Sequence, residues 1–513
     1  MKMKKISLLK RPFVRVLPLF MPPRFTDNPL VATEVNESNI QFAILTQSDF
    51  LRELYPSGHK ILDPHYYPDQ YIYDESEEVK AANGGKGAWM RRSVYRYAAP
   101  LQFVILIKQL ATLCGEKISL KDTSPEPSEA KKKLFQEWKQ EWEDRNMNEM
   151  FYQCVKSEKS TGDCALAFWF DRERKFHCRP FSYSEGDTLY DFRDPSTGKR
   201  TGFARRYTLA DEEGNGVSFV EYWDEKNVYR FRQSQTGEVS DTLRTGVAAA
   251  MGLDGYALEE GYPLAHGFNR CPIAYKFSPS GPCWSVVQEL IDQYEMNMSL
   301  LGENNKATAF TVMYFLGDEI DIKGGVDGRP YAISSPNPDT KVGAISQPQE
   351  SGNFSLMLKT SLDHILMGSF TVVPPEVRSG DLAGVAVKLI FSPSLELGLA
   401  EAKEWNPFVD DMVELFSFGL GIEKGRPSDF NTLSVHGEII PHIHQNTAEL
   451  VNNLCQSVLN GILSAETAIE NNPFSAPDEK TRVEKEAILE NIKESKLEEG
   501  MNEYNLQRKK SEE

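Results

Sequence analysis

Residues 371–420 read TVVPPEVRSGDLAGVAVKLIFSPSLELGLAEAKEWNPFVDDMVELFSFGL and decide the architecture. A short loop marked by proline and glycine, Val373 to Gly384, separates two segments with apolar residues at helical spacing. The upstream segment carries Phe354, Leu358, Leu362, Ile365 and Phe370, and the downstream one Leu389, Trp405, Phe408, Val409, Met412, Leu415 and Phe416. A loop held between two helices can project into a space that both border, so this loop is the first candidate functional segment.

Size and composition narrow the class of protein. The chain has 513 residues, which suffices for two to four domains, and it is 40% hydrophobic and 11% aromatic, so large cores can form. Its formal net charge of −18 argues against a protein that grips duplex DNA with a Lys/Arg surface. It does not exclude a protein past which DNA slides.

Cysteine spacing and the N-terminal segment exclude further classes. The seven cysteines form no CxxC pair, so we expect reduced thiols and no zinc site. The start MKMKK resembles a signal peptide, but Lys10, Arg11 and Arg15 interrupt the apolar segment after it and no small-residue cleavage site is present, so we expect no secretion. The apolar run Ala98–Leu113 contains Lys108 and is too short to span a bilayer. We interpret it as a buried helix and expect no membrane association.

Periodicity predicts an α+β chain whose first half is helical and then antiparallel β. We expect residues 1–80 to be irregular with short strands and residues 81–88 to form a turn. Helices are predicted at Ser93–Leu113 and Lys131–Ser157, joined by a polar linker at 121–130. Short aromatic strands are then predicted from Cys164 to about Lys276, separated by turns at 194–200 and 211–216.

The second half alternates long helices with short strands. A helix is predicted at Trp284–Lys306, with apolar residues stepping by three and four: Val287, Leu290, Ile291, Tyr294, Met298 and Leu301. Strands are predicted at 310–317, 329–334 and 433–443. Further helices are predicted from about 353, after Gly384 and at 446–463, with Ser464 as the N-cap of a restart and a solvated helix from Asp478. We expect Pro393 and Pro407 to bend or interrupt the helix after Gly384.

A search for chemistry finds no convincing site. Gly198-Lys199 lacks the remaining residues of a phosphate-binding loop, and no GxSxG element is present. His442 and His444 could share one face of a strand, but no other metal ligands accompany them. Asp410 and Asp411 are adjacent on a predicted helix and diverge by about 100°, so they cannot converge on a metal alone. We therefore predict no catalytic residues, no cofactor and no metal site.

Four stretches in the right order carry a resemblance to a known family. They are SVYRYAAPLQFVILIKQLATLCGEKISLKD (93–122), HGFNRCPIAYKFSPSGPCWSVVQELIDQYEMNMS (266–299), SGDLAGVAVKLIFSPSLELGLAEAKEWNPFVDDMVELF (379–416) and NTAELVNNLCQSVLNGILSAETAIENNPFSAPDEKTRVEKEA (446–487). Together they resemble the portal proteins of tailed bacteriophages, in the siphovirus-like portal family. The resemblance covers about residues 80–490. Residues 1–80 match nothing in it, the turn near 379–384 has fewer glycines than many members, and Pro393 falls early in the long helix.

The resemblance implies a portal fold assembled as a ring. The regions it implies are an N-terminal irregular segment (1–80), a wing of helices then antiparallel strands (81–283), a stem helix (284–306), a small clip (307–352), a second stem helix (353–370), a tunnel loop (371–384), a long kinked helix of the wing (385–432), and a crown with a C-terminal tail (433–513). The stem helices would pack through Val287, Leu290, Ile291, Tyr294 and Met298 on one side, and Leu358, Leu362 and Ile365 on the other.

The implied function is a channel at one capsid vertex through which double-stranded DNA is packaged and later ejected. About twelve copies would form the ring, and the sequence does not decide between twelve and thirteen. The implied partners are the terminase large subunit, a head-completion or adaptor protein, the major capsid and scaffolding proteins, and DNA bound without sequence specificity. The protein would reside in the virion, and in the host cytoplasm during assembly.

The loop would form a constriction facing DNA. Its apolar residues would be Val373, Pro374, Pro375, Val377 and Leu382, its charge would come from Glu376, Arg378 and Asp381, and Gly380 and Gly384 would allow a hinge. The plainer alternative is an ordinary helix–helix connection. At the level of the whole chain, the alternatives are another phage structural protein, such as a head–tail adaptor or a capsid protein, and a DNA-processing enzyme with an unrecognised site. Oligomer mass and metal-dependent cleavage would separate them.

Overall fold

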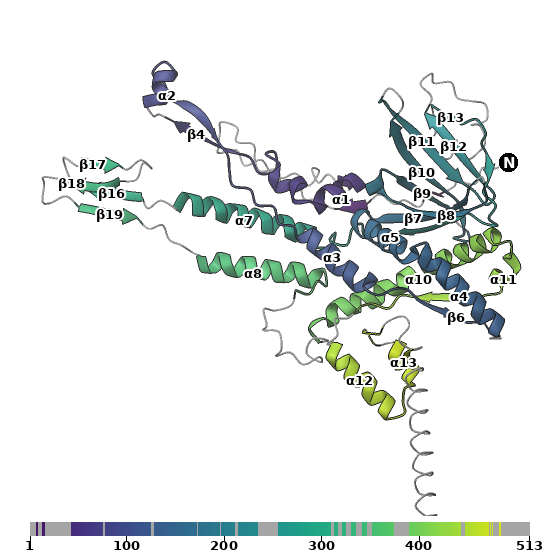
Figure 1. Ribbon diagram of the computed structural model, residues 1–513. Coiled ribbons are helices and arrows are strands. Elements are labelled where there is room, and N and C mark those ends of the chain that lie inside the picture. The colour runs from purple at the N-terminus through teal and green to yellow at the C-terminus, as the bar shows by residue number, and fades with distance from the viewer. Residues whose placement is uncertain are drawn as a thin grey trace, which may run out of the picture. The chain divides into compact units, whose positions relative to one another are not determined.

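The computed structural model describes most of the chain (Figure 1). The described residues are 7–8, 13–15, 43–475 and 482–483, apart from gaps at 75–76, 125–127, 172, 195, 211–213, 234–254, 309–311, 317–320, 325–329, 335–340, 346–350, 374–388, 443–446, 471 and 473. They divide into one compact unit formed by residues up to Val373 together with Pro393–His442, and a second formed by 374–392 and 443–513. The mixture of helices and strands confirms the predicted α+β class.

A helical core fills the centre of the first unit. It contains α1 (Gln47–Leu54), α3 (Leu101–Cys114), α4 (Glu129–Asp144), α5 (Met147–Thr161), α10 (Ser392–Glu423) and the short α11 (Pro427–Asn431). The buried indoles of Trp138 and Trp142 stack with centroids 5.0 Å apart, and the ring of Phe416 meets each of them edge-on at 5.2 Å. These contacts join α4 to α10, because large aromatic side chains contribute both apolar burial and favourable ring geometry.

Antiparallel sheets cover this core (Figure 1). Among the described residues, a seven-stranded sheet has the order β1-β9-β10-β11-β12-β13, with β14 also paired to β12, and a smaller sheet has the order β15-β7-β8. The bounds are β1 Ser7–Leu8, β7 Asp163–Phe170, β8 Phe176–Phe181, β9 Thr188–Arg193, β10 Arg200–Ala210, β11 Gly216–Trp223, β12 Asn227–Gln233, β13 Tyr256–Leu258, β14 Leu264–Ala265 and β15 Ile273–Phe277. The predicted antiparallel β region is therefore confirmed.

Two-stranded ribbons and 3-10 turns complete the first unit. The ribbons pair β2 (Phe13–Arg15) with β3 (Ala43–Leu45), β4 (Gln70–Asp74) with β5 (Ala88–Arg92), and β6 (Ser119–Asp122) with β20 (Val435–Glu438). The helix α2 (Glu77–Ala82) lies between β4 and β5 in the chain. The 3-10 turns are η2 (Pro56–Gly58), η3 (Lys60–Leu62) and η4 (Tyr183–Glu185).

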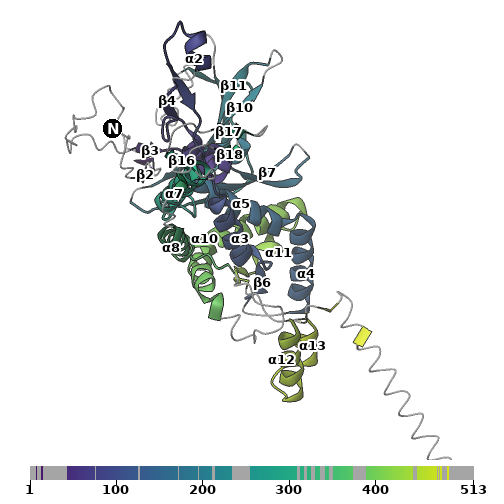
Figure 2. The ribbon, with the colours of Figure 1, turned by 90° about the vertical axis from the view of Figure 1, so that its left-hand side faces the viewer.

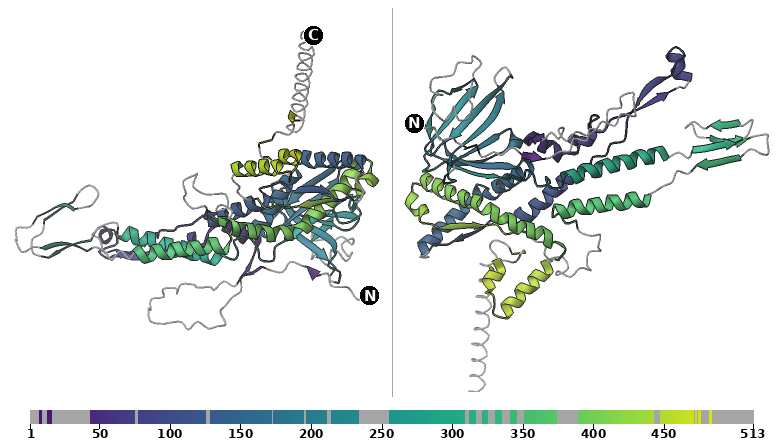
Figure 3. Two further views of the ribbon diagram at one scale, coloured as in Figure 1. Left: turned by 90° about the horizontal axis from the view of Figure 1, so that it is seen from below. Right: turned by 180° about the vertical axis from the view of Figure 1, so that it is seen from behind.

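A long helical hairpin leaves the core. Its arms are α7 (Gln288–Thr308) and α8 (Ser351–Gly368), which lie side by side (Figures 1 and 3). The chain between them contains β16 (Val312–Leu316) paired with β19 (Lys341–Ile345), and β17 (Asp321–Gly324) paired with β18 (Pro330–Ser334). The expected strands at 310–317 and 329–334 are thus confirmed.

The second unit contains α12 (Thr447–Leu459) and α13 (Ala465–Glu470). The Ser464 hydroxyl accepts a hydrogen bond from the Thr467 amide at 3.2 Å, so the predicted N-cap is confirmed. The helix before it ends at Leu459 rather than Leu463. The helix expected from Asp478 falls almost entirely outside the described residues.

Several predicted boundaries are wrong, each for a local reason. The helix predicted from Ser93 begins only at Leu101, because a residue before proline disfavours helical geometry and Pro100 forms the N-cap. The single helix expected at Lys131–Ser157 is two helices, because Asn146 adopts a left-handed conformation with φ of 53°.

The predictions about residues 1–80 and the two prolines also need correction. Residues 47–54 form α1 instead of irregular structure, and Thr46 and Asp49 close a capping box at its start. Pro393 does not interrupt α10, because it lies in the first turn, where no amide donor is needed. Pro407 lies inside α10, which continues to Glu423. The strand expected at 433–443 is only Val435–Glu438.

Candidate functional site

The base of the α7–α8 hairpin is held by apolar packing. Val287, Ile291 and Ile365 are buried in the main core cluster. Gly368 sits so close to Val287 that an added Cβ would lie 2.9 Å from the Val287 Cγ1 atom. The base of the hairpin is therefore tightly packed. Such packing resists rotation of one helix against the other.

One stripe of α7 above this base is polar, and two of its side chains, Glu295 and Ser299, are buried. Glu295, Ser299 and Glu303 follow one another at intervals of four residues and so lie on one face of the helix. Their side chains accept hydrogen bonds from backbone amides of an extended segment: Ala99 N to Glu295 at 2.8 Å, Tyr97 N to Ser299 at 2.9 Å, and Tyr95 N to Glu303. The spacings match, because two extended residues advance about 6.6 Å and four helical residues about 6 Å.

His59 joins the same stripe from another part of the chain. Its Nδ1 atom lies 2.6 Å from the Glu295 carboxylate, and its Nε2 atom lies 2.8 Å from the Glu53 carbonyl oxygen. A doubly protonated ring beside the Glu295 carboxylate satisfies both contacts, because it donates from both nitrogen atoms. The two side chains are 2% and 1% exposed, so this is a buried ion pair that fixes residues 46–62 to α7.

A second buried polar cluster ties the other arm of the hairpin to the core. The Lys159 ammonium on α5 lies 2.5 Å from the Glu401 carboxylate on α10 and donates to the Gln109 side-chain oxygen on α3 at 3.0 Å. The Gln109 amide donates in turn to the carbonyl oxygen of Ser369, directly after α8, at 3.0 Å. Three core helices and the end of α8 therefore meet at one lysine.

Burial dominates the electrostatics around this cluster. It raises the pKa of the neighbouring Glu158 to about 7, although the positive charge of Lys159 opposes the shift. Burial also raises the pKa of the Cys283 and Cys114 thiols to about 12. These thiols stay protonated near neutral pH, so they lack the thiolate that nucleophilic chemistry requires.

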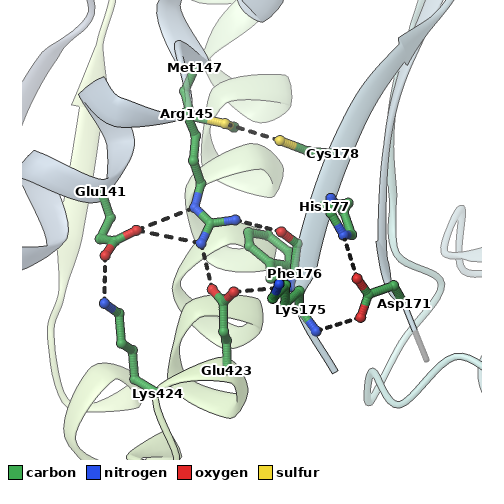
Figure 4. A network of polar contacts seen from close by, with 10 residues as sticks. All are labelled: Glu141, Arg145, Met147, Asp171, Lys175, Phe176, His177, Cys178, Glu423 and Lys424. Atoms are coloured by element: carbon green, nitrogen blue, oxygen red, sulfur yellow. Dashed lines mark hydrogen bonds and ion pairs between the residues drawn. The ribbon is translucent and has the colours of Figure 1, made fainter. Parts of the chain in front are cut away.

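A third network fixes the far end of α10 (Figure 4). Arg145, just after α4, lies 2.5 Å from the Glu423 carboxylate and donates to the Phe176 carbonyl oxygen on β8 at 2.5 Å. Glu141 binds both Arg145 and the Lys424 ammonium, the latter at 2.6 Å. Burial favours the neutral form of Glu141, but the bonds to Lys424 and Arg145 outweigh it and lower its pKa. Both ends of α10 are thus held by charged side chains.

A comparison with protein families identifies this architecture. The family model described as phage portal protein, SPP1 Gp6-like, matches residues 41–502 of the chain. The chain belongs to the phage portal protein family. No curated protein gives a significant match. The resemblance seen in the four sequence stretches is confirmed, and the family is one of structural components of phage virions.

The residues predicted to pack the stem differ from one another in how far they are buried. Val287, Ile291 and Ile365 are buried, whereas Tyr294, Met298, Leu358 and Leu362 are half-buried and Leu290 is exposed. Val287 precedes the first turn of α7. Their predicted role in packing the stem stays a prediction.

The predicted tunnel loop falls mostly outside the described residues. Of the residues predicted to face DNA, Val373 is described and exposed, whereas Pro374 to Gly384 lie in the gap at 374–388. The segment that leads to it is ordered by hydrogen bonds, since Ser369 Oγ contacts Thr371 Oγ1 at 3.0 Å and Ser394 donates to the Phe370 carbonyl oxygen at 2.8 Å. The start of the loop is therefore firmly positioned.

The carboxylates and histidines weighed for catalysis serve as ion-pair partners. Asp411 lies 2.9 Å from Arg270, while Asp410 lies 3.5 Å from His436, so the two carboxylates diverge as predicted. His442 contacts Glu116 at 2.8 Å, and His444 lies outside the described residues. In the described part of the chain, no group of three or more His, Cys, Asp and Glu side chains is placed to hold a metal ion.

None of the described helices combines the length and the apolar composition needed to cross a membrane.

The most informative residues of the hairpin were not found from the sequence. Glu295 and Ser299 sit among the apolar positions of the predicted helix, at four and eight residues from Ile291. Polar residues inside an apolar repeat signal a buried hydrogen-bonding role, and that signal was available. His59 and Lys159 carry no such signal, because their partners lie 236 and 242 residues away in the chain.

Proposed function

We propose that copies of this chain form a closed ring around a channel through which double-stranded DNA is packaged into the capsid and later ejected. The membership in the portal family supports this function. The ring would sit at one capsid vertex, contain about twelve copies and bind DNA without sequence specificity. It would present docking surfaces to the terminase large subunit, a head-completion or adaptor protein, and the major capsid and scaffolding proteins.

The observation that carries the ring is the apolar surface of the hairpin. Leu300 on α7 and Leu356, Met357 and Met367 on α8 are exposed in the single chain, and Leu356 and Met367 are 65% and 70% exposed. Each fully covered aliphatic side chain stabilises an assembly by about 1.5–3 kcal/mol. Adjacent copies in a ring would cover these side chains. A head-to-tail interface forms a closed ring when the rotation between neighbouring copies divides a full turn.

The regions of the fold would divide the work of the ring. In this proposal residues 81–283 and 385–432 form the wing, α7 and α8 the stem, 307–352 the clip that faces the motor, and 433–513 the crown. Residues 371–384 form the tunnel loop. The firm attachment of Ser369 and Phe370 supports a loop that starts from a fixed point.

The net charge suits passage rather than capture of DNA. Twelve copies would carry 12 × −18 = −216 formal charges. Acidic residues on a channel wall repel the phosphate backbone, and a wall that releases no counterions binds DNA weakly. Translocation needs this weak interaction.

Two measurements test the proposal. Electron micrographs and native mass of the purified chain should show perforated discs of about twelve times 58.1 kDa. Deletion of residues 375–381 should leave the discs intact but impair DNA packaging or retention. A chain that remains a compact monomer under all assembly conditions would refute the ring, and normal genome filling by the deletion variant would refute the role of the loop.

A further inference from the structure

Three sulfur atoms meet where α5 packs against the smaller sheet. Helix α5 lies against β7 and β8 (Figures 1 and 2). The Cys178 Sγ atom on β8 lies 3.4 Å from the Met147 Sδ atom and 3.3 Å from the Met150 Sδ atom. Figure 4 shows the contact between Cys178 and Met147. We call these three side chains the sulfur cluster.

Two elements of the fold bring the sulfur cluster together. Met147 and Met150 are three residues apart in the first turn of α5, so they lie on one face of the helix. Cys178 faces the helix from β8, because side chains alternate along a strand and Phe176, two residues earlier, is buried in the same core. Arg145, just before α5, donates to the Phe176 carbonyl oxygen and so holds the strand in register with the start of the helix.

The Cys178 thiol differs from the other buried thiols in its partners. The thiols of Cys154 and Cys271 each contact a backbone carbonyl oxygen at 3.9 Å. In the described part of the chain, the hydrogen-bonding contacts of the Cys178 side chain are with the two thioethers, which are weak acceptors. Core packing requires apolar atoms at these positions, but it does not require three sulfur atoms to point at one another.

The chemistry of the sulfur cluster suits a soft metal ion. Thiolate and thioether ligands select Cu(I) over harder ions. In a trigonal site with metal–sulfur bonds of about 2.3 Å, the sulfur atoms lie about 4 Å apart. The separations of 3.3 and 3.4 Å would therefore have to open by about 0.6–0.7 Å. Methionine allows this movement, because its side chain is unbranched and has three rotatable bonds.

The charge of the site favours a monovalent ion. Burial raises the pKa of the Cys178 thiol to about 12, although the positive charge of Arg145 opposes the shift. An ion therefore binds by displacing the thiol proton: the S–H bond breaks, the metal–sulfur bond forms and the proton leaves to solvent. One monovalent ion, one thiolate and two neutral thioethers sum to zero charge, whereas a divalent ion leaves a positive charge beside Arg145.

The sulfur cluster is open on one side. Met147 is fully buried, whereas Cys178 and Met150 are half-buried, so an ion can approach from the surface. The ring of the adjoining His177 points away from the cluster and binds Asp171 at 3.0 Å (Figure 4). The three sulfur atoms therefore supply the ligands without an imidazole.

We propose that Met147, Met150 and Cys178 form a binding site for Cu(I). The bound ion joins the first turn of α5 to β8 within one chain. The inference goes beyond the proposed DNA channel and does not depend on assembly of the ring.

Anaerobic Cu(I) binding by the full-length chain tests the site. Cys455, which is exposed, is first replaced by serine, and the resulting parent chain is dialysed against Cu(I) buffered by a chelator. It should retain one ion per chain, and Cys178→Ser should retain none. Met150→Leu, which conserves volume, should weaken binding at least about tenfold. The matched control is Met412→Leu, which changes a fully buried methionine of α10 and should bind as the parent does.

X-ray absorption at the copper edge keeps the test decisive if Cys178→Ser folds poorly, because it needs only the parent chain. It should show sulfur neighbours at about 2.3 Å and no nitrogen or oxygen neighbours. A shell of nitrogen or oxygen atoms would overturn the proposal, and so would a parent chain that retains no ion. Equal retention by Cys178→Ser and the parent would assign the ion to another thiol and also overturn the site. None of these outcomes bears on the ring.

Discussion

The buried pair of His59 and Glu295 makes a quantitative prediction about how residues 46–62 are held on α7. Replacing Glu295 by glutamine keeps an oxygen that can accept the Ala99 amide but removes the negative charge beside the imidazolium. Replacing His59 by glutamine removes the positive charge and leaves the carboxylate buried. Each change isolates one charge without deleting the bulk of the side chain.

The expected cost depends on burial. The two side chains are almost completely withdrawn from water, so removing one partner should lower the free energy of unfolding by about 3–5 kcal/mol. The double variant should lose much less than the sum of the single losses, by a coupling of about 1–3 kcal/mol. The neighbouring pair of Lys60 and Asp292, 24% and 12% exposed, is the control, and Lys60→Gln should cost about 1 kcal/mol or less.

The assay is urea unfolding of the dissociated subunit, followed by circular dichroism and by tryptophan fluorescence. Trp284 is a local reporter, because its indole donates to the Glu53 carboxylate at 3.2 Å and the Glu53 carbonyl oxygen accepts from His59. Strictly additive losses would show that the two side chains do not interact. A loss no larger than that of Lys60→Gln would show that the pair is not the anchor.

Packing, burial and exposure give three further predictions. The pKa of Glu158 is about 7 in the folded chain and about 4.5 in the unfolded chain, so the folded chain binds the extra proton between these pH values. The free energy of unfolding should therefore fall by about 3 kcal/mol as the pH rises from 4.5 to above 7. Urea titrations of Glu158→Gln should show a smaller decline over that range. Gly419→Ala places a Cβ within the Phe176 ring's van der Waals radius and should lower stability by about 1–3 kcal/mol, whereas Gly352→Ala on α8 meets no atom within 4 Å and should be neutral or stabilising. A maleimide should modify Cys455 rapidly in the native chain and the buried thiols only after unfolding, and mass spectrometry of the labelled peptides checks this order.

Local patterns predicted the elements of the fold well where the signal is local. The alternating aromatic strands between Cys164 and Lys276, the arms of the hairpin and the Ser464 cap all depend on residues close in sequence. The break at Asn146 could not be predicted in this way, because asparagine is compatible with a helix interior and nothing local to it marks the φ of 53° that separates α4 from α5.

The candidate site was predictable only in part. The apolar steps at Val287, Ile291 and Ile365 identified the base of the hairpin, because burial there follows helical periodicity. The same periodicity placed Leu290 with them, yet this side chain is exposed. The ion pairs of His59 and Lys159 depend on residues more than two hundred positions apart, which no local pattern records.

The backbone amides of Tyr95, Tyr97 and Ala99 form a ladder of donors on the polar stripe of α7. This ladder limits how many residues can be inserted into the extended segment. Because alternate residues of an extended strand face opposite ways, inserting one residue between Tyr95 and Ala99 would turn part of the ladder's donors away from their acceptors on α7. Only a change of two residues, matched by one turn of the helix, restores the register. Portal relatives that differ in this stretch should therefore gain or lose residues there in pairs, accompanied by four in the helix.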